Sequence, residues 1–151
     1  ALWTINVLLF ILLIWWGMFW WSGHENWYAY EYLFITLYAI VLFFLASILY
    51  PWDMQGDIDV REHFFNNRLW FFGALFLAWC LDIPETVIKA NADLRPVPQE
   101  YFWFVGIQLA IAATGLATRR HIVHLLLPIL WFSLTVYYVL LSSLGFITSS
   151  G

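Results

Sequence analysis

The segment WYAYEYLFITLYAIVLFFLASILY, residues 27–50, carries one charged residue, Glu31, in 24 positions. A helix of about 20 apolar residues is long enough to cross a hydrocarbon core of about 30 Å. The apolar side chains of this segment surround the whole helix, as they do in helices that face lipid or the inside of a bundle. The segment therefore predicts a membrane-spanning helix.

Four more segments meet the same criterion. The sequence predicts an all-α, multi-pass transmembrane bundle of about five helices, at residues 2–21, 27–50, 69–89, 101–118 and 121–147. Only 11% of the 151 residues are charged, against roughly 25% in a soluble domain. The length favours a single transmembrane domain, residues 1–151. Because the chain starts at Ala1 rather than at a methionine, a further helix before it is compatible with the sequence.

Two of the connectors, residues 22–26 and 118–121, are so short that the helices they join are expected to be antiparallel neighbours. The connector before the third span is longer. In it, Asp59 and Glu62 have the spacing of a capping box, with Asp in place of the usual Ser or Thr. This predicts a short interfacial helix near residues 60–68 that leads into the third span.

The basic residues predict an orientation, because short cytoplasmic loops carry an excess of Lys and Arg. Four of them fall on one side of the predicted membrane and two on the other; the first group is Arg61, Arg68, Arg119 and Arg120, and the second is Lys89 and Arg95. We expect the Arg-rich loops in the cytoplasm and the C-terminus outside. The four arginines are also candidate anchors to headgroup phosphates or to acids of a neighbouring subunit.

Composition and missing motifs narrow the functional classes. The net charge is −4 and there is no basic run, which argues against nucleic acid as a partner. The single cysteine, Cys80, permits neither a disulfide within the chain nor a cysteine-based metal site. The sequence also lacks a phosphate-binding glycine loop, a nucleophile elbow and a zinc-protease helix motif, so an enzymatic function is disfavoured.

Asp82 is the foremost candidate for a functional group inside the membrane, where ionisable residues are costly. Counted from Leu69, it lies roughly 20 Å along the third helix. Pro84 removes one backbone hydrogen bond, and the freed carbonyl beside a carboxylate would suit a cation or a proton. In the alternative interpretation Asp82 caps a new helical turn, and Glu85 pairs with Lys89 at the i,i+4 spacing.

Glu31 and Gln108 complete the set of ion- or proton-binding candidates, with Asp82 and Glu85. Glu31 would share a weakly hydrated site with these carboxylates if the second and third helices pack together; otherwise it faces water at headgroup level. Gln108 lies among small residues of the fourth helix. Two pairs of these are four residues apart: Gly106 with Ala110, and Ala113 with Ala117. That spacing predicts close helix contact and a central position for this helix. The amide group of Gln108 is expected to form a hydrogen bond to a neighbouring helix, with substrate binding as the alternative.

Three of the four histidines fall on the predicted cytoplasmic side: His63, His121 and His124. They permit a metal or haem site, although a transmembrane haem usually needs histidines on facing helices at matched depth. Contacts with headgroups or loops are the alternative. The sequence requires no cofactor; haem, a pigment or a quinone is compatible with it.

Residues 59–73, DVREHFFNNRLWFFG, resemble a segment of uncharacterised multi-pass proteins of bacterial inner membranes. In those proteins an acidic-Arg-x-His-aromatic run leads into Arg-x-Trp-Phe-Phe at the start of a helix. The likeness covers about a tenth of the chain and implies no known activity. It implies a location in the bacterial inner membrane and a special importance of Asp59, Arg61, His63 and Arg68.

Three functional hypotheses follow. The favoured one is a non-enzymatic accessory or assembly subunit that packs against other membrane proteins, lipids or cofactors, because aromatic residues make up 22% of the chain and the loops are short. The second is a small transporter or an ion- or proton-conducting protein that uses Asp82 and Glu31, as a homo-oligomer because five helices enclose little space. The third is a membrane haem or redox protein. Expected partners are the lipid bilayer and either other membrane subunits or further copies of the chain.

Overall fold

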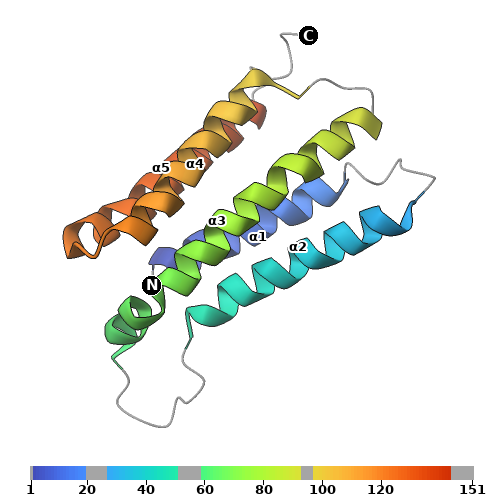
Figure 1. Cartoon of the computed structure of the whole chain (residues 1–151). Helices are drawn as coiled ribbons and strands as arrows, with labels where there is room; N and C mark the ends of the chain where they lie inside the picture. Colours follow the sequence, from blue (N-terminus) through green and yellow to red (C-terminus); the bar gives the residue numbers. More distant parts are fainter. Residues whose placement is uncertain (1, 20–26, 51–58, 93–96, 144–151) are drawn as a thin grey trace.

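The computed structural model describes residues 2–19, 27–50, 59–92 and 97–143, and the regular structure in these ranges is helical. Five α-helices follow one another: α1 (Leu2–Met18), α2 (Ala29–Ile48), α3 (Val60–Ala92), α4 (Gln99–Ala117) and α5 (His121–Ser143). They extend roughly along a common direction, with α3 between α2 and the α4–α5 pair (Figure 1). The predicted all-helical bundle is confirmed.

Four of the five helices, α2 to α5, are long and apolar enough to cross a membrane. Helix α1 is apolar but has 17 residues in the described part of the chain. The end of the predicted first span, at residues 20 and 21, lies outside the described residues, as does the end of the predicted fifth span beyond residue 143. The observed structure thus supports four spans by length and composition and adds a shorter apolar helix.

The short helix expected at residues 60–68 runs directly into the third span and is not a separate element. It forms the first turns of one helix of 33 residues. Asp59 caps the start: its Oδ1 accepts the backbone N–H of Arg61 at 2.9 Å and that of Glu62 at 3.2 Å. No glycine or proline lies between Val60 and Leu69, so nothing interrupts the hydrogen-bond ladder there.

The packing centre is α3, not the fourth helix as predicted. Helix α3 has its largest interfaces with α4 and with α2, while α5 packs on α4 and α1 lies against α2 and α5. The expected neighbours, α1 with α2 and α4 with α5, are both in contact. Aromatic rings join the layers: Phe10 of α1 stacks on Trp79 of α3 at 4.6 Å between centroids, and Phe104 of α4 stacks on Tyr138 of α5 at 4.2 Å.

The small residues of α4 face both inward and outward. The predicted close-contact pairs face no other described helix of this chain, because they lie on the exposed side of α4; these residues are Gly106, Ala110, Ala113 and Ala117. Their close contact with a helix of another chain stays a prediction. The close approach to α3 is made by Gly115, where an added Cβ would lie 2.4 Å from Cδ1 of Phe72. Only glycine allows that ring to rest against the α4 backbone.

Candidate ionisable site in the bundle

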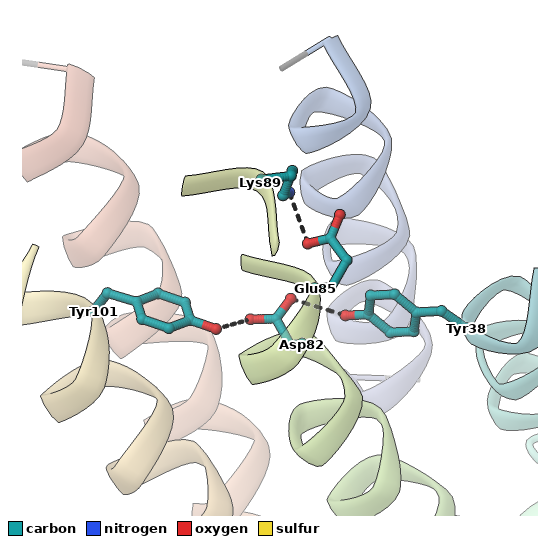
Figure 2. A network of polar contacts seen from close by, with 5 residues as sticks. All are labelled: Tyr38, Asp82, Glu85, Lys89 and Tyr101. Carbon is teal, nitrogen blue, oxygen red and sulfur yellow. Dashed lines mark hydrogen bonds and ion pairs between the residues drawn. The ribbon is translucent and has the colours of Figure 1, made fainter. Parts of the chain in front are cut away.

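The carboxyl group of Asp82 ties together the three central helices. Its Oδ1 accepts a hydrogen bond from the Tyr38 hydroxyl of α2 at 3.0 Å, and its Oδ2 accepts one from the Tyr101 hydroxyl of α4 at 2.7 Å. Figure 2 shows the two phenols approaching Asp82 from opposite sides. All three side chains are buried. Each carboxyl oxygen therefore has a donor from a different helix, and the group is fixed on both sides.

One turn further along α3, a second acid forms an ion pair. Glu85 Oε2 lies 2.7 Å from Lys89 Nζ (Figure 2), which confirms the i,i+4 pair expected from the sequence. Glu85 is buried and Lys89 is half-buried. The ammonium group also reaches α1, since a Cβ added at Gly17 would lie 3.4 Å from it. The polar cluster of Tyr38, Asp82, Glu85, Lys89 and Tyr101 thus touches α1, α2, α3 and α4.

Two buried acids, Asp82 and Glu85, lie on successive turns of α3. Glu85 is paired with Lys89, whereas the hydrogen bonds of Asp82 come from the hydroxyl groups of two tyrosines, which are neutral donors. An ionised carboxyl group is costly to hold in a low-dielectric interior, whereas a protonated, hydrogen-bonded one is not.

The helix is continuous at Asp82, so the interpretation of this residue as a cap of a new turn is wrong. Helix α3 runs past Pro84 to Ala92. Proline removes one backbone hydrogen bond of the ladder, but α3 is flanked here by α2 and α4, to which Asp82 is tied. The side chain of Asp82 accordingly bonds to neighbouring helices and does not cap the backbone of α3.

Glu31 and Gln108 are both buried, in different parts of the bundle. Glu31 Oε2 accepts the backbone N–H of Tyr28 at 2.9 Å and so caps the start of α2. Gln108 Nε2 donates a hydrogen bond to Thr135 Oγ1 of α5 at 3.0 Å, which confirms the expected hydrogen bond of this amide group to a neighbouring helix. The approach of Glu31 to Asp82 or Glu85, and ion or substrate binding by either residue, stay predictions.

The opposite end of the bundle holds a second group of buried polar side chains. Arg68 Nη1 donates to three carbonyl oxygens at the end of α4: those of Gly115 and Leu116 at 3.3 Å and that of Thr118 at 2.8 Å. Arg68 is buried, so it does not occupy the surface position predicted for a headgroup anchor. A cation at the C-terminal end of a helix stabilises the helix dipole and satisfies carbonyls that lack a partner.

The histidines at this end also contact helix ends. His63 Nε2 lies 3.1 Å from the carbonyl oxygen of Ile48, at the end of α2, and His124 Nε2 lies 2.9 Å from that of Thr118. His121 packs against Phe65, with 5.3 Å between ring centroids. Within the described ranges, no three His, Cys, Asp or Glu side chains are grouped so that they could hold a metal ion. A haem site built from these three histidines stays a prediction.

The remaining predicted anchors, Arg61, Arg119 and Arg120, are exposed. Arg61 lies in the first turn of α3, and the other two lie in the short connection before α5. Because Arg68 pairs with the end of α4 in the same region, these arginines share one end of the bundle. Their positions suit contact with headgroups, and that role stays a prediction.

Sequence reasoning did not identify the tyrosines as partners of Asp82. A signal for them exists in the sequence, because Tyr38 lies near the middle of the 27–50 segment and a tyrosine hydroxyl at that depth needs a hydrogen-bond partner. Asn6 was also missed: it is buried in α1 and its Nδ2 donates to the carbonyl oxygen of Pro128 in α5 at 2.8 Å. The hydrogen bonds of Asp82 with the tyrosines and of Asn6 with Pro128 all join different helices.

Comparison with known proteins gives no relative: no family model matches the chain, and neither the curated proteins nor the solved structures contain a match.

Proposed function

We propose that this chain is a membrane protein that binds and exchanges a proton at Asp82, as a small proton-conducting or proton-coupled transport protein. The observation that supports the proposal is the burial of the Asp82 carboxyl group between two neutral tyrosine hydroxyls. Ionisable residues within membrane spans commonly belong to proton or ion pathways. The sequence alone favoured an accessory subunit; the two hydroxyl contacts of Asp82 shift the preference to this second hypothesis.

The chemistry of the three side chains suits a proton better than a metal cation. Ionised Asp82 accepts two hydrogen bonds, and protonated Asp82 accepts one and donates its own O–H. A tyrosine hydroxyl both donates and accepts, so Tyr38 or Tyr101 can rotate to receive that proton. A metal cation would instead need several ligands directed at one point, and among the described residues no three His, Cys, Asp or Glu side chains are grouped to supply them.

The test is proton flux through the Asp82→Asn variant. Purified protein is reconstituted into lipid vesicles with an imposed pH gradient, and an enclosed dye reports the internal pH. Asparagine keeps the shape and one acceptor oxygen but cannot take up the proton, so we expect the flux to fall roughly tenfold or more.

The matched control is Glu62→Gln, which also removes one acidic group from α3 but at an exposed position near its start. We expect wild-type flux for this control. If Asp82→Asn carries protons as fast as the wild type while remaining folded, Asp82 is not the proton-binding residue and the proposal fails.

The second candidate function is assembly with other membrane proteins or with further copies of this chain, which was the hypothesis favoured by sequence. It is supported by the outward face of α4, which presents a row of small residues, Gly106, Ala110, Ala113 and Ala117, to the surroundings. Small residues at this spacing allow two helix backbones to approach closely in a membrane. A Cβ at Gly106 would meet nothing within 4 Å in this chain, so the space there is open to a partner.

Gly106→Leu tests the assembly function, because leucine would hold a partner helix away from α4. In mild detergent we expect the wild type to form a particle of defined mass above that of one chain, and the variant to form the smaller particle. An unchanged mass in the variant would place any interface elsewhere. A partner of another sequence and a second copy are told apart by the composition of the particle.

We further propose that the protein resides in a bacterial inner membrane, with Arg61, Arg119 and Arg120 on the cytoplasmic side. The support is the positive-inside rule applied to the exposed arginines at one end of the bundle. Cysteine labelling in whole cells, in a Cys80→Ala background, tests it. We expect a membrane-impermeant reagent to label Glu100→Cys from outside and not Arg119→Cys; the reverse pattern contradicts the orientation.

A further inference from the structure

The interior between the two polar groups contains buried polar atoms without a hydrogen-bond partner. Five of them lie on four different helices: Asn6 Oδ1, Trp79 Nε1, Gln108 Oε1, His124 Nδ1 and Trp131 Nε1. All five side chains are more than nine-tenths buried. Each such group costs about 1–3 kcal/mol when it stays unpaired. In a hydrocarbon surrounding, no bulk solvent is available to relieve that cost.

Contacts join the middle atoms into one region. Gln108 donates to the Thr135 hydroxyl at 3.0 Å, and Thr135 donates to the Trp131 carbonyl at 2.8 Å. The ring of Phe10 stacks on Trp79 at 4.6 Å and meets Trp131 edge-on at 5.9 Å between centroids. The rings of Trp79 and Trp131 therefore both contact Phe10, and Gln108 is linked to Trp131 through Thr135.

Helix geometry places this region midway between the two polar groups. Gln108 is seven residues from Tyr101, which contacts Asp82, and seven from Gly115, whose carbonyl contacts Arg68. Seven residues of helix span about 10 Å. Towards the Arg68 end, Asn6 donates to the carbonyl of Pro128, which lies one turn from His124. Unpaired polar atoms thus occur at intervals along the core between Asp82 and His124.

The unpaired atoms have the chemistry that water completes. The two indoles donate, the amide oxygens of Asn6 and Gln108 accept, and a water molecule can accept from one and donate to the other. Buried waters in proteins typically make about three hydrogen bonds to such groups. An apolar ligand would leave every one of these atoms unpaired.

We infer that internal waters occupy the core between Asp82 and His124, with Gln108 as the central contact, and that they carry protons between Asp82 and the Arg68 end of the bundle. The role in proton transfer rests on the proposed function of Asp82; the presence of water does not. A water bonded to Gln108 relays a proton without any change in the charge of the protein. Gln108 is in this view a positioning residue, which orients the water.

The first experiment measures water contact at the indoles. Protein with ¹⁵N-labelled tryptophan is placed in lipid discs, and magnetisation transfer from water to each indole N–H is recorded by NMR, with signals assigned through Trp79→Phe and Trp131→Phe. We expect transfer at both indoles in the wild type and its loss in Gln108→Leu. The control Gln99→Leu makes the same change at an exposed position of α4 and should keep the transfer.

The second experiment separates this inference from the proposed function. Proton flux in vesicles is compared for the wild type, Asp82→Asn and Gln108→Leu, and the Asp82 carboxyl is followed by ¹³C NMR over a pH series. Supporting results are a roughly tenfold lower flux in Gln108→Leu together with an Asp82 carboxyl that still changes protonation state.

The inference is overturned if the indoles receive no magnetisation from water, or if Gln108→Leu retains both the transfer and the wild-type flux; the role of Asp82 would survive either result. If flux is unaffected by Asp82→Asn, the proton function fails instead. Water transfer that still depends on Gln108 would then support the internal waters alone.

Discussion

Replacing Arg68 with methionine is expected to lower the free energy of unfolding by about 2–4 kcal/mol. Methionine keeps most of the aliphatic volume but donates no hydrogen bond. The carbonyl oxygens of Gly115, Leu116 and Thr118 would lose the guanidinium that contacts all three. The end of α4 would also lose the positive charge that favours its dipole. Because Arg68 belongs to α3, the change weakens the largest interface of the bundle.

Titration of the folded protein in lipid-detergent micelles with a denaturing detergent, followed by circular dichroism, measures this loss. The control is Arg61→Met, two turns earlier on the same helix, where the side chain is exposed and the expected change is within about 0.5 kcal/mol. Equal stability losses in the two variants would show that the contacts of Arg68 with α4 contribute nothing specific.

Gly115→Ala is expected to destabilise the protein by about 1–3 kcal/mol, although alanine is the better helix former. The added Cβ would come within 2.4 Å of the Phe72 ring. Trp3, Phe71 and His124 pack against that ring at centroid distances of 5.3, 5.2 and 5.4 Å and restrict its movement. The clash therefore favours separation of α4 from α3.

Gly73→Ala is the matched comparison, since a Cβ at Gly73 of α3 meets nothing within 4 Å. There we expect no loss, or a gain of about 0.5–1 kcal/mol from the helix preference of alanine. The same denaturation measurement applies to both variants. If Gly115→Ala behaves like Gly73→Ala, the two helices do not approach as closely at Phe72 as the packing indicates.

The features that were predictable from sequence depend on neighbours along the chain. The 27–50 segment predicted α2 because its apolar residues are consecutive, and Asp59 predicted the start of α3 because a cap contacts the next turn. The Glu85–Lys89 pair followed in the same way, since residues four apart lie on one face of a helix. Asp82 stood out because it is a charged residue within an apolar run.

What the sequence did not predict depends on which side of each helix faces inward. In a soluble protein, polar residues mark the outer face, but lipid is as apolar as the core and removes that distinction. The small residues of α4 therefore gave no sign that Gly115 faces α3 while Gly106 faces outward. The same ambiguity hid the burial of Arg68 and the pairing of Asp82 with Tyr38 and Tyr101, which bring together residues far apart in the sequence.

The length of α3 has a consequence for its two ends. At 33 residues it is about 50 Å long, well beyond the roughly 30 Å of a bilayer core. In the membrane location that we propose, even a tilted α3 would extend past the hydrocarbon, with the exposed Arg61 and Glu62 in the headgroup layer or beyond it. One continuous helix thus connects these exposed charged residues to the buried Asp82.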